Sequence, residues 1–295
     1  MPALLNRTVL VTGASTGIGR ACVMELARQG ARVFAGVRDA EVGSVLASQA
    51  PDRITPLLLD VTDRAQIAAA VTAIGAATRD DGLFGLVNNA GIVVAGPLEV
   101  LPEAALREQF EVNTFGAFAL TQACLPLLRR ARGRIVNVTS VNGRIVSPFT
   151  GAYAASKFAL EAMSDALRRE LAPTGVAVIV VQPGSIRTPI WTRSRVRAQR
   201  LAEHLPPASR ALYTSVLARI GEVAVPKRAL PPESVAVVVA KALLAARART
   251  RYRVGWDARL GVLLAHALPG RALDWLMGVR RRRRHGNGAG VGRDS

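Results

Sequence analysis

The chain has 295 residues, half of them hydrophobic, and a formal net charge of +18 at pH 7. This length suits one large α/β domain or two small ones, and the apolar content is enough for a sizeable core. The only two cysteines, Cys22 and Cys124, lie far apart in apolar helical patterns, and the three histidines lack nearby acidic or cysteine partners. These features argue against a disulfide framework or a metal site, and they favour a reducing compartment.

The N-terminus lacks the long apolar region of a signal peptide, and no apolar run reaches the ~18–20 residues that a spanning helix needs. We therefore expect a cytoplasmic protein. Much of the excess arginine lies in residues 129–134, 187–200 and 280–284. Such a balance suggests nucleic acid or an anionic membrane surface as a partner, but arginine used generically on solvated faces produces the same charge.

Strand and helix patterns alternate from the start. A β-branched apolar run over Thr8–Thr12 leads directly into a turn, Gly13–Gly19, that contains three glycines. A helical pattern over Arg20–Gln29 follows and ends at Gly30. Glycines in this context allow a tight turn and close approach to a pyrophosphate, which then sits on the N–H groups at the helix N-terminus. The turn predicts a dinucleotide site, although its Gly-x-x-x-Gly-x-Gly spacing is not the commoner Gly-x-Gly-x-x-Gly.

The second strand, Ala31–Val37, ends in Arg38 and Asp39. An acidic residue at this strand end selects NAD through the adenosine ribose hydroxyls, whereas a guanidinium can hold a 2′-phosphate. Because Val37 occupies the usual acidic place and Arg38 follows, the sequence favours NADP(H). NAD(H) is the alternative if the Asp39 carboxylate faces the ribose.

The next two strands also end in polar residues. Strand Ile54–Leu59 leads to Asp60, which is placed to accept from an adenine amino group or to cap the helix over Asp63–Ala77, a role that Asp63 or Thr62 could fill equally well. Strand Leu83–Val87 ends in Asn88-Asn89-Ala90-Gly91. Small and amide residues there suit a cofactor that runs across the sheet edge.

A long helical region over Glu103–Arg130 carries Asn113 in its interior. Asparagine is tolerated there at some cost, which suggests a local kink with a functional role. Strand Arg134–Val138 then ends at Thr139-Ser140, and strand Val176–Val181 ends at Gln182-Pro183-Gly184.

Between these two strands a helix that continues to about Leu171 carries Tyr153 and Lys157. Four residues apart, the two side chains share one helix face. A neighbouring ammonium stabilises a phenolate and lowers the phenol pKa from about 10, so the pair is suited to moving a hydroxyl proton.

The C-terminal part begins with a basic helical insertion from Trp191 to Arg228, followed by a helix over Glu233–Ala246 and a short strand over Tyr252–Val254. We expect one domain over residues 1–254, with a substrate-loop insertion at 186–230, an amphipathic helical extension over 255–285 and a disordered tail over 286–295. The extension cannot span a bilayer. It is expected either to lie on one, with residues 280–284 at anionic headgroups, or to close over the substrate pocket.

Taken together, these motifs resemble the short-chain dehydrogenase/reductase (SDR) family over residues 6–254. The resemblance is carried, in order and with matching spacing, by Thr12–Gly19, Asp60, Asn88–Gly91, Asn113, Ser140, Tyr153 with Lys157, and Pro183-Gly184. Residues 32–38 and 183–189 look most like the retinol and hydroxysteroid dehydrogenase branch. The resemblance implies a doubly wound (Rossmann) parallel sheet of about seven strands flanked by helices, with the cofactor along the carboxyl ends of the strands.

The resemblance also implies roles for individual residues. Tyr153 would be the acid/base, Lys157 would lower its pKa and hold the nicotinamide ribose, and Ser140 would bond the substrate oxygen. Asn113 would position a water that links Lys157 to solvent. The residues expected at the cofactor are Gly13, Ser15, Thr16, Gly17, Ile18, Gly19, Arg38, Asp60, Val61, Asn89, Ala90, Gly91, Tyr153, Lys157, Pro183, Gly184, Ile186 and Thr188. Those expected at the substrate are Ser140, Asn142, Phe149, Tyr153, Gln182, Gly184 and Trp191.

The predicted function is therefore NAD(P)-dependent interconversion of a hydroxyl and a carbonyl on a small hydrophobic substrate such as a sterol, retinoid or lipid. We expect a homo-oligomer, a dimer or tetramer built through the helices that carry Asn113 and Tyr153. The alternative is a cofactor-binding regulatory protein that uses its arginine clusters on a membrane or on nucleic acid, without redox activity.

Overall fold

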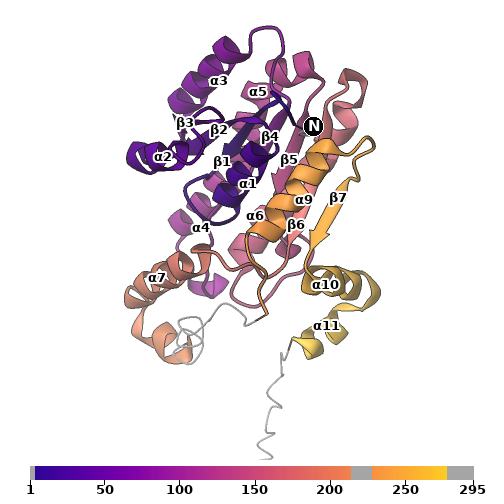
Figure 1. Ribbon diagram of the computed structural model, residues 1–295. Coiled ribbons are helices and arrows are strands. Elements are labelled where there is room, and N and C mark those ends of the chain that lie inside the picture. The colour runs from indigo at the N-terminus through magenta and orange to yellow at the C-terminus, as the bar shows by residue number, and fades with distance from the viewer. Residues whose placement is uncertain (1–3, 214–227, 278–295) are drawn as a thin grey trace, which may run out of the picture.

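The computed structural model describes residues 4–213 and 228–277. Its centre is a seven-stranded sheet in the order β3-β2-β1-β4-β5-β6-β7, and all neighbouring strands are parallel (Figure 1). This confirms the predicted fold class. The strands are β1 Thr8–Thr12, β2 Arg32–Val37, β3 Ile54–Leu58, β4 Gly85–Asn88, β5 Arg134–Val138, β6 Ala177–Pro183 and β7 Arg251–Val254.

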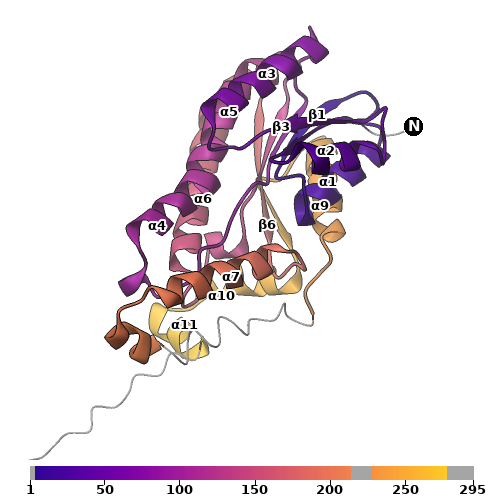
Figure 2. The ribbon, with the colours of Figure 1, turned by 90° about the vertical axis from the view of Figure 1, so that its left-hand side faces the viewer.

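Helices cover both faces of the sheet (Figure 2). One face carries α1 (Gly17–Arg28), α2 (Ala40–Ala47) and α9 (Glu233–Leu244). The other carries α3 (Arg64–Thr78), α4 (Glu103–Phe110), α5 (Ala117–Ala131) and α6 (Gly151–Glu170). Three further helices lie at the end of the sheet where the strands have their carboxyl ends: α7 (Ile190–Glu203), α10 (Trp256–Ala267) and α11 (Gly270–Leu276).

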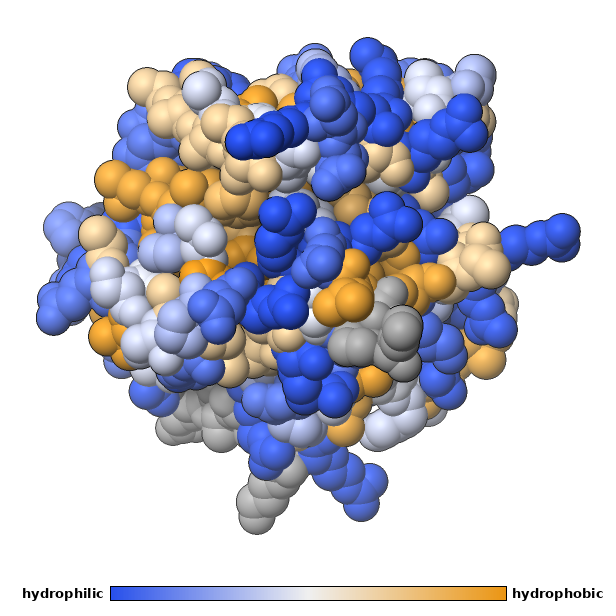
Figure 3. Space-filling view, turned by 45° about the horizontal axis from the view of Figure 1, so that its top comes forward, coloured by the Kyte–Doolittle hydropathy of each residue, from blue (hydrophilic) through white to orange (hydrophobic). Residues whose placement is uncertain are grey.

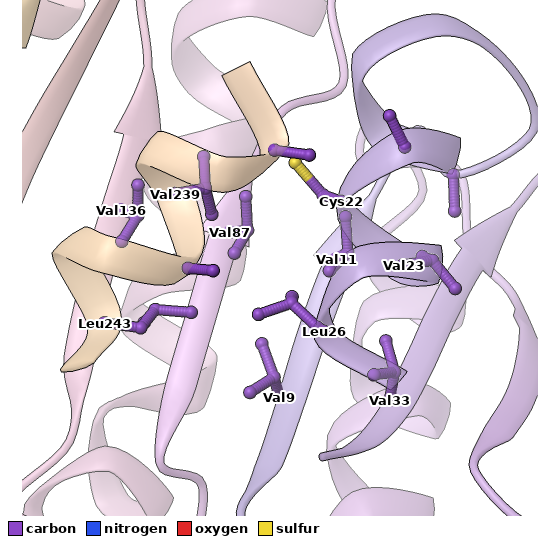
Figure 4. Packing of buried hydrophobic residues seen from close by; sticks show 14 of the residues in the cluster. Val9, Val11, Cys22, Val23, Leu26, Val33, Val87, Val136, Val239 and Leu243 are labelled. Atoms are coloured by element: carbon purple, nitrogen blue, oxygen red, sulfur yellow. The ribbon is translucent and has the colours of Figure 1, made fainter. Parts of the chain in front are cut away.

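The core consists of two hydrophobic clusters, one on each side of the sheet. Val9 and Val11 of β1 pack with Leu26 of α1 and Val239 of α9 on one side (Figure 4). Leu10, between the two valines, belongs to the cluster on the other side, because alternate side chains of a strand point to opposite faces. A strand buried on both faces reads as a continuous apolar run, which is why β1 could be located in the sequence.

The elements observed differ from those predicted mainly between Glu103 and Arg130. The expected single helix is interrupted by a π-helical segment, η2 (Glu111–Gly116), which carries Asn113. Tight packing accompanies this interruption: a Cβ on Gly116 would lie 2.7 Å from Val61 Cγ2. The local irregularity expected at Asn113 is thus a π-helical segment, and π-helical turns are frequent at functional sites.

Two other elements depart from the prediction. Helix α1 begins at Gly17, three residues before the predicted start, so that two of the turn glycines belong to its first turn. Helix α2 was not predicted. The predicted tail over 286–295, the arginine run at 280–284 and part of the insertion at 186–230 lie outside the described residues.

The face of the molecule in Figure 3 carries hydrophilic side chains that interrupt small hydrophobic groups. Within residues 4–213 and 228–277, none of the helices combines the length and apolar character needed to cross a bilayer.

Candidate active site

An open cleft of about 1230 Å³, adjoining solvent included, runs along the carboxyl ends of the strands. Its centre lies where β1 and β4 are neighbours and the strand order reverses, the position at which open parallel sheets bind ligands. Of the residues expected at the cofactor, Gly19 alone does not line it. The lining residues are Gly13, Ser15, Thr16, Gly17, Ile18, Gly36, Arg38, Leu59, Asp60, Val61, Asn89, Ala90, Gly91, Ile92, Val112, Val138, Thr139, Ser140, Tyr153, Lys157, Pro183, Gly184, Ile186, Thr188, Pro189, Ile190, Trp191 and Arg193.

The glycine turn forms one wall of the cleft. Gly13 and Gly17 have φ angles of 63° and 57°, a backbone conformation that residues with a Cβ rarely adopt. Thr16 stands at the N-cap of α1 but its side chain makes no capping hydrogen bond, and the first turn contains no acidic residue. The N–H groups at this helix end are therefore suited to bind an anion such as a pyrophosphate.

Gly19 has a packing role instead. A Cβ at this position would lie 2.2 Å from the Gly13 carbonyl oxygen and 2.6 Å from Asn89 Nδ2. Asn89 Nδ2 in turn donates to the Thr12 carbonyl oxygen at 2.9 Å. These contacts fasten the glycine turn to the end of β4.

Of the polar residues that follow β2, Asp39 caps a helix and Arg38 faces the cleft, near Asp60 at the end of β3. Asp39 caps α2, since its Oδ1 accepts from Glu41 N–H at 2.9 Å and from Val42 N–H at 3.3 Å. Arg38 lines the cleft with its side chain 69% exposed, and its Nη1 lies 4.0 Å from Asp60 Oδ2. A guanidinium and a carboxylate therefore stand together at the edge of the cleft.

Asp60 is not the cap of α3. Asp63 fills that place, accepting from the N–H groups of Ala65 and Gln66. Asp60 Oδ1 accepts from the N–H and the hydroxyl of Thr62 at 2.9 and 2.7 Å, which holds the carboxylate at the cleft.

At the other end of the cleft, α6 presents Tyr153 and Lys157 beside Ser140, which follows β5. Both α6 side chains are buried, and Lys157 Nζ donates to the Val138 carbonyl oxygen at 2.9 Å. Nζ lies 5.9 Å from the centre of the Tyr153 ring. Ser140 Oγ accepts from Asn142 N–H at 3.1 Å, and Ser140 also hydrogen-bonds the Tyr153 oxygen. The structure thus brings together the three groups that the sequence predicted.

Burial dominates the electrostatics of these groups. It raises the pKa of Tyr153 above its usual value, and the hydrogen bond from Ser140 offsets only part of that increase. It lowers the pKa of Lys157 to about 8, against the opposing attraction of Glu161. The prediction that Tyr153 has a lowered pKa is therefore wrong for this chain by itself. At neutral pH Tyr153 is a phenol, which can donate a proton.

Asn113 lies behind the cleft and does not line it. Its Nδ2 donates to the Ile92 carbonyl oxygen at 3.0 Å and to Ser156 Oγ at 3.2 Å, while its Oδ1 accepts from Ile92 N–H at 2.8 Å. Asn113 therefore links the segment after β4 to α6, the helix of Tyr153.

Four of the seven residues expected at the substrate line the cleft: Ser140, Tyr153, Gly184 and Trp191. Asn142, Phe149 and Gln182 do not. Strand β6 extends two residues beyond its predicted end, so Gln182 is still inside the sheet. It is fully buried, and its Nε2 donates to Glu161 Oε1 at 2.9 Å. Asn142 instead donates to Thr150 Oγ1 at 3.3 Å, and Phe149 occupies a left-handed backbone position with φ 66°.

The prediction missed Glu161, a carboxylate one turn beyond Lys157 that is only 3% exposed. Its Oε1 accepts from Thr139 Oγ1 at 2.7 Å, and its Oε2 accepts from Arg144 and Arg251 at 3.1 and 3.0 Å. An acidic residue four positions after Lys157 was a signal that could have located this network.

The C-terminal extension also reaches the site. Asp257 Oδ2 accepts from Ser185 N–H at 2.7 Å. A Cβ on Gly184 would lie 2.2 Å from Asp257 Oδ1. The first turn of α10 therefore fixes the loop that carries Gly184, Ile186 and Thr188 along the cleft.

The glycine turn, the uncapped helix end and the Tyr–Lys–Ser group together define a dinucleotide-dependent oxidoreductase. The model of the short chain dehydrogenase family matches residues 7–199. Retinol dehydrogenase 5 of Mus musculus is 39% identical over 275 residues, which cover 90% of this chain and 86% of that relative. The 3-amino-tetrahydro-pyrrolizinone reductase of Xenorhabdus hominickii is 43% identical over 210 residues, or 71% of this chain and 72% of the relative.

Solved structures agree. A short chain dehydrogenase from Burkholderia cenocepacia J2315, crystallised in complex with NADP, superposes with a TM-score of 0.72 at 29% identity, covering 93% of this chain and 98% of that one. The chain belongs to the short-chain dehydrogenase/reductase family and lies nearest its retinol dehydrogenase branch. It is an NAD(P)-dependent oxidoreductase.

Proposed function

We propose that this enzyme uses NADP(H) to interconvert a hydroxyl and a carbonyl on a small hydrophobic substrate, with Tyr153 as the acid/base. The observation that carries the proposal is the meeting of Tyr153, Ser140 and Lys157 in the same cleft as the glycine turn. When bound, the nicotinamide supplies or takes the hydride.

The division of labour follows from the geometry of the chain. As a buried phenol, Tyr153 gives its proton to the carbonyl oxygen of a substrate during reduction, and it takes that proton back during oxidation. Ser140 orients the same oxygen with a second hydrogen bond. Lys157, held by the Val138 carbonyl, places a positive charge next to the phenolate that reduction leaves behind. Since burial raises the pKa of Tyr153, reduction is favoured at neutral pH and oxidation at alkaline pH.

The preference for NADP(H) rests on Arg38 and Asp39. Asp39 is engaged as the cap of α2, which leaves the exposed guanidinium of Arg38 to bind a 2′-phosphate. The relative from Burkholderia cenocepacia, solved with NADP, is consistent with this assignment. The Asp60 carboxylate reduces the preference for NADP(H), because it lies 4.0 Å from the Arg38 guanidinium that would bind the 2′-phosphate.

A hydrophobic substrate is supported by the part of the cleft next to Tyr153. There Ile190, at the start of α7, packs against the small apolar cluster that contains Tyr153, and Ile186 and Trp191 add apolar lining to the same cleft. Likeness to a retinol dehydrogenase points in the same direction. Apolar lining is general among small-molecule sites, so the class of substrate has to be tested with a panel.

The deciding experiment follows NADPH and NADH oxidation with a panel of apolar ketones and aldehydes. Three proteins are compared: wild type, Tyr153→Phe and the matched control Tyr252→Phe, whose hydroxyl lies outside the cleft and accepts from Arg249 N–H. We expect Tyr153→Phe to reduce kcat by at least about 100-fold while NADPH binding, measured by fluorescence, stays within about twofold. Tyr252→Phe should retain full activity. Unchanged turnover in Tyr153→Phe would refute the role of the phenol.

The cofactor assignment has its own test. Arg38→Ala should weaken NADPH binding by about 10- to 100-fold and leave NADH binding nearly unchanged, because a charge-assisted bond to phosphate contributes about 1.5–3 kcal/mol. Arg32→Ala, at the opposite end of β2, is the control. An equal loss for both cofactors would contradict a contact with the 2′-phosphate.

We also expect a homo-oligomer built through the helices around Asn113 and Tyr153. Two large apolar side chains on these helices, Phe115 and Phe158, are exposed. Light scattering coupled to gel filtration would give the oligomeric state, and Phe115→Ser with Phe158→Ser should shift it towards monomer.

A further inference from the structure

Helix α7 supplies a positive charge to the cleft. It carries four arginines, at positions 193, 195, 197 and 200, and of these Arg193 alone lines the cleft. Within residues 4–213 and 228–277, Arg197 pairs with Glu108 at 2.5 Å, whereas the exposed side chain of Arg193 has no ion pair. Arg193 therefore presents an unpaired guanidinium to the space that the glycine turn also lines.

The position of Arg193 follows from the start of α7, which lies at the carboxyl end of the sheet in both views (Figures 1 and 2). The Arg193 N–H donates to the Pro189 carbonyl oxygen at 3.0 Å, so Arg193 stands one helical turn beyond Pro189 and close to the same helix face. The segment before it lies against the glycine turn: a Cβ on Gly17 would be 3.8 Å from Pro189 Cδ and 3.1 Å from Thr188 Cβ. Helix α7 therefore begins next to the first turn of α1, and Arg193 follows one turn later.

The charged side chains that line the cleft are mostly positive. Three of them are cationic: Arg38, Lys157 and Arg193. Among the described residues, Asp60 provides the one acidic side chain in this lining. Arg38 stands 4.0 Å from Asp60 at one end of the cleft, and Lys157 is buried at the other end. Arg193 is the cation that neither end accounts for, and a cleft with such an excess of positive charge attracts anionic ligands.

We propose that Arg193 binds the diphosphate of the cofactor from the side opposite the start of α1. The N–H groups at that helix end approach the diphosphate from one wall of the cleft, and the guanidinium approaches it from the α7 wall. A guanidinium makes short, charge-assisted hydrogen bonds to phosphate oxygens, frequently two in parallel. Such a contact needs only the NAD(P) dependence of the enzyme. It does not depend on the proposed substrate or on the proposed preference for NADP(H).

Two anions other than the diphosphate could bind an arginine in this cleft. A 2′-phosphate belongs at the end of β2, away from the start of α7. An acidic group on the substrate would lie beside Tyr153, and Ile190, three residues before Arg193, packs against the cluster that contains Tyr153. The closeness of Pro189 to Gly17 favours the diphosphate, because it holds the start of α7 against the turn at which the diphosphate binds.

Cofactor binding to the full-length protein, measured without substrate, tests this contact. NADPH and NADH are titrated by fluorescence, and ADP-ribose, which has the diphosphate but neither nicotinamide nor a 2′-phosphate, is titrated by calorimetry. Arg193→Met should weaken the binding of all three by a similar factor of about 10- to 100-fold, because each loses the same charge-assisted hydrogen bond. Arg38→Ala, in contrast, should weaken the binding of NADPH alone, so the two substitutions give different patterns.

The matched control is Arg195→Met, which removes the same charge from an exposed position of α7 that does not line the cleft. It should change each dissociation constant by less than about twofold, and circular dichroism checks that both variants are folded.

Three results would overturn the proposal. A loss in Arg193→Met that is confined to NADPH would assign the guanidinium to the 2′-phosphate. Unchanged binding of all three ligands would leave substrate or solvent as its partner. An equal loss in Arg195→Met would be a general effect of charge. Because Tyr153→Phe should bind all three ligands normally, failure of this contact and failure of the proposed proton transfer are distinguishable.

Discussion

Because Lys157 is buried, we expect its positive charge to lower the free energy of unfolding of the protein. Burial lowers the pKa of this ammonium from 10.5 to about 8. At about 1.4 kcal/mol for each pKa unit, keeping it charged at pH 7 costs the folded state about 3 kcal/mol. Lys157→Met removes that cost but also removes the hydrogen bond to the Val138 carbonyl, which contributes about 1 kcal/mol. The variant should therefore be inactive yet more stable than wild type by about 2 kcal/mol at pH 7.

The sign of the pH dependence gives a second check. Because the folded-state pKa is the lower one, the unfolded chain binds more protons between about pH 8 and 10.5, and wild-type stability gains from this group as pH rises through that window. Above it the lysine is neutral in both states. The advantage of Lys157→Met should accordingly shrink from pH 7 to pH 10.

Urea unfolding at both pH values, followed by circular dichroism, measures the difference. Lys241→Met, at an exposed position of α9, is the matched control and should change stability by less than about 0.5 kcal/mol at either pH. A Lys157→Met protein that is less stable than wild type at pH 7, or a stability gain that does not change with pH, would refute the reasoning.

Substitutions of three further residues test contacts that stabilise the site. For each variant, urea unfolding measures the change in the free energy of unfolding. Asp39→Ala should cost about 1 kcal/mol by removing the cap of α2, whereas Asp39→Asn, which keeps the cap, should cost much less; equal losses would contradict the capping role. Gly19→Ala should cost about 1–3 kcal/mol and weaken NADPH binding, because its Cβ would collide with backbone, while Gly75→Ala in α3 meets only ordinary contacts and should stabilise by about 0.5–1 kcal/mol. Glu161→Gln should cost about 3 kcal/mol by leaving two arginines without their shared carboxylate; a near-neutral result would mean that the network does not hold the charge as described.

The fold was predictable because its signals are local. Each buried parallel strand is a short apolar run, and each is followed by small or polar residues where the cleft forms. The glycine turn and Asp60 were located in this way, and the Tyr153–Lys157 pair by its helical spacing; Gly13, Gly17, Asp60, Tyr153 and Lys157 all line the cleft.

What the sequence did not reveal depends on contacts between distant residues. The place of Gln182 was mistaken because the end of β6 is set by its pairing with β7, not by its own residues. The raised pKa of Tyr153 follows from burial by the surrounding fold, which a motif of five residues does not contain. The Glu161 carboxylate accepts hydrogen bonds from Arg144, which lies 17 positions before it, and from Arg251, which lies 90 positions after it.

The bond between Asp257 and Ser185 spans 72 positions, and this has a consequence for biosynthesis. A nascent chain that has emerged as far as β6 already contains every residue proposed for proton transfer and can begin to form its sheet. Its loop after β6 still lacks the carboxylate that fixes it, and Glu161 still lacks Arg251. The residues proposed for proton transfer are therefore made early, but their surroundings gain these two contacts only when β7 and the start of α10 have been synthesised.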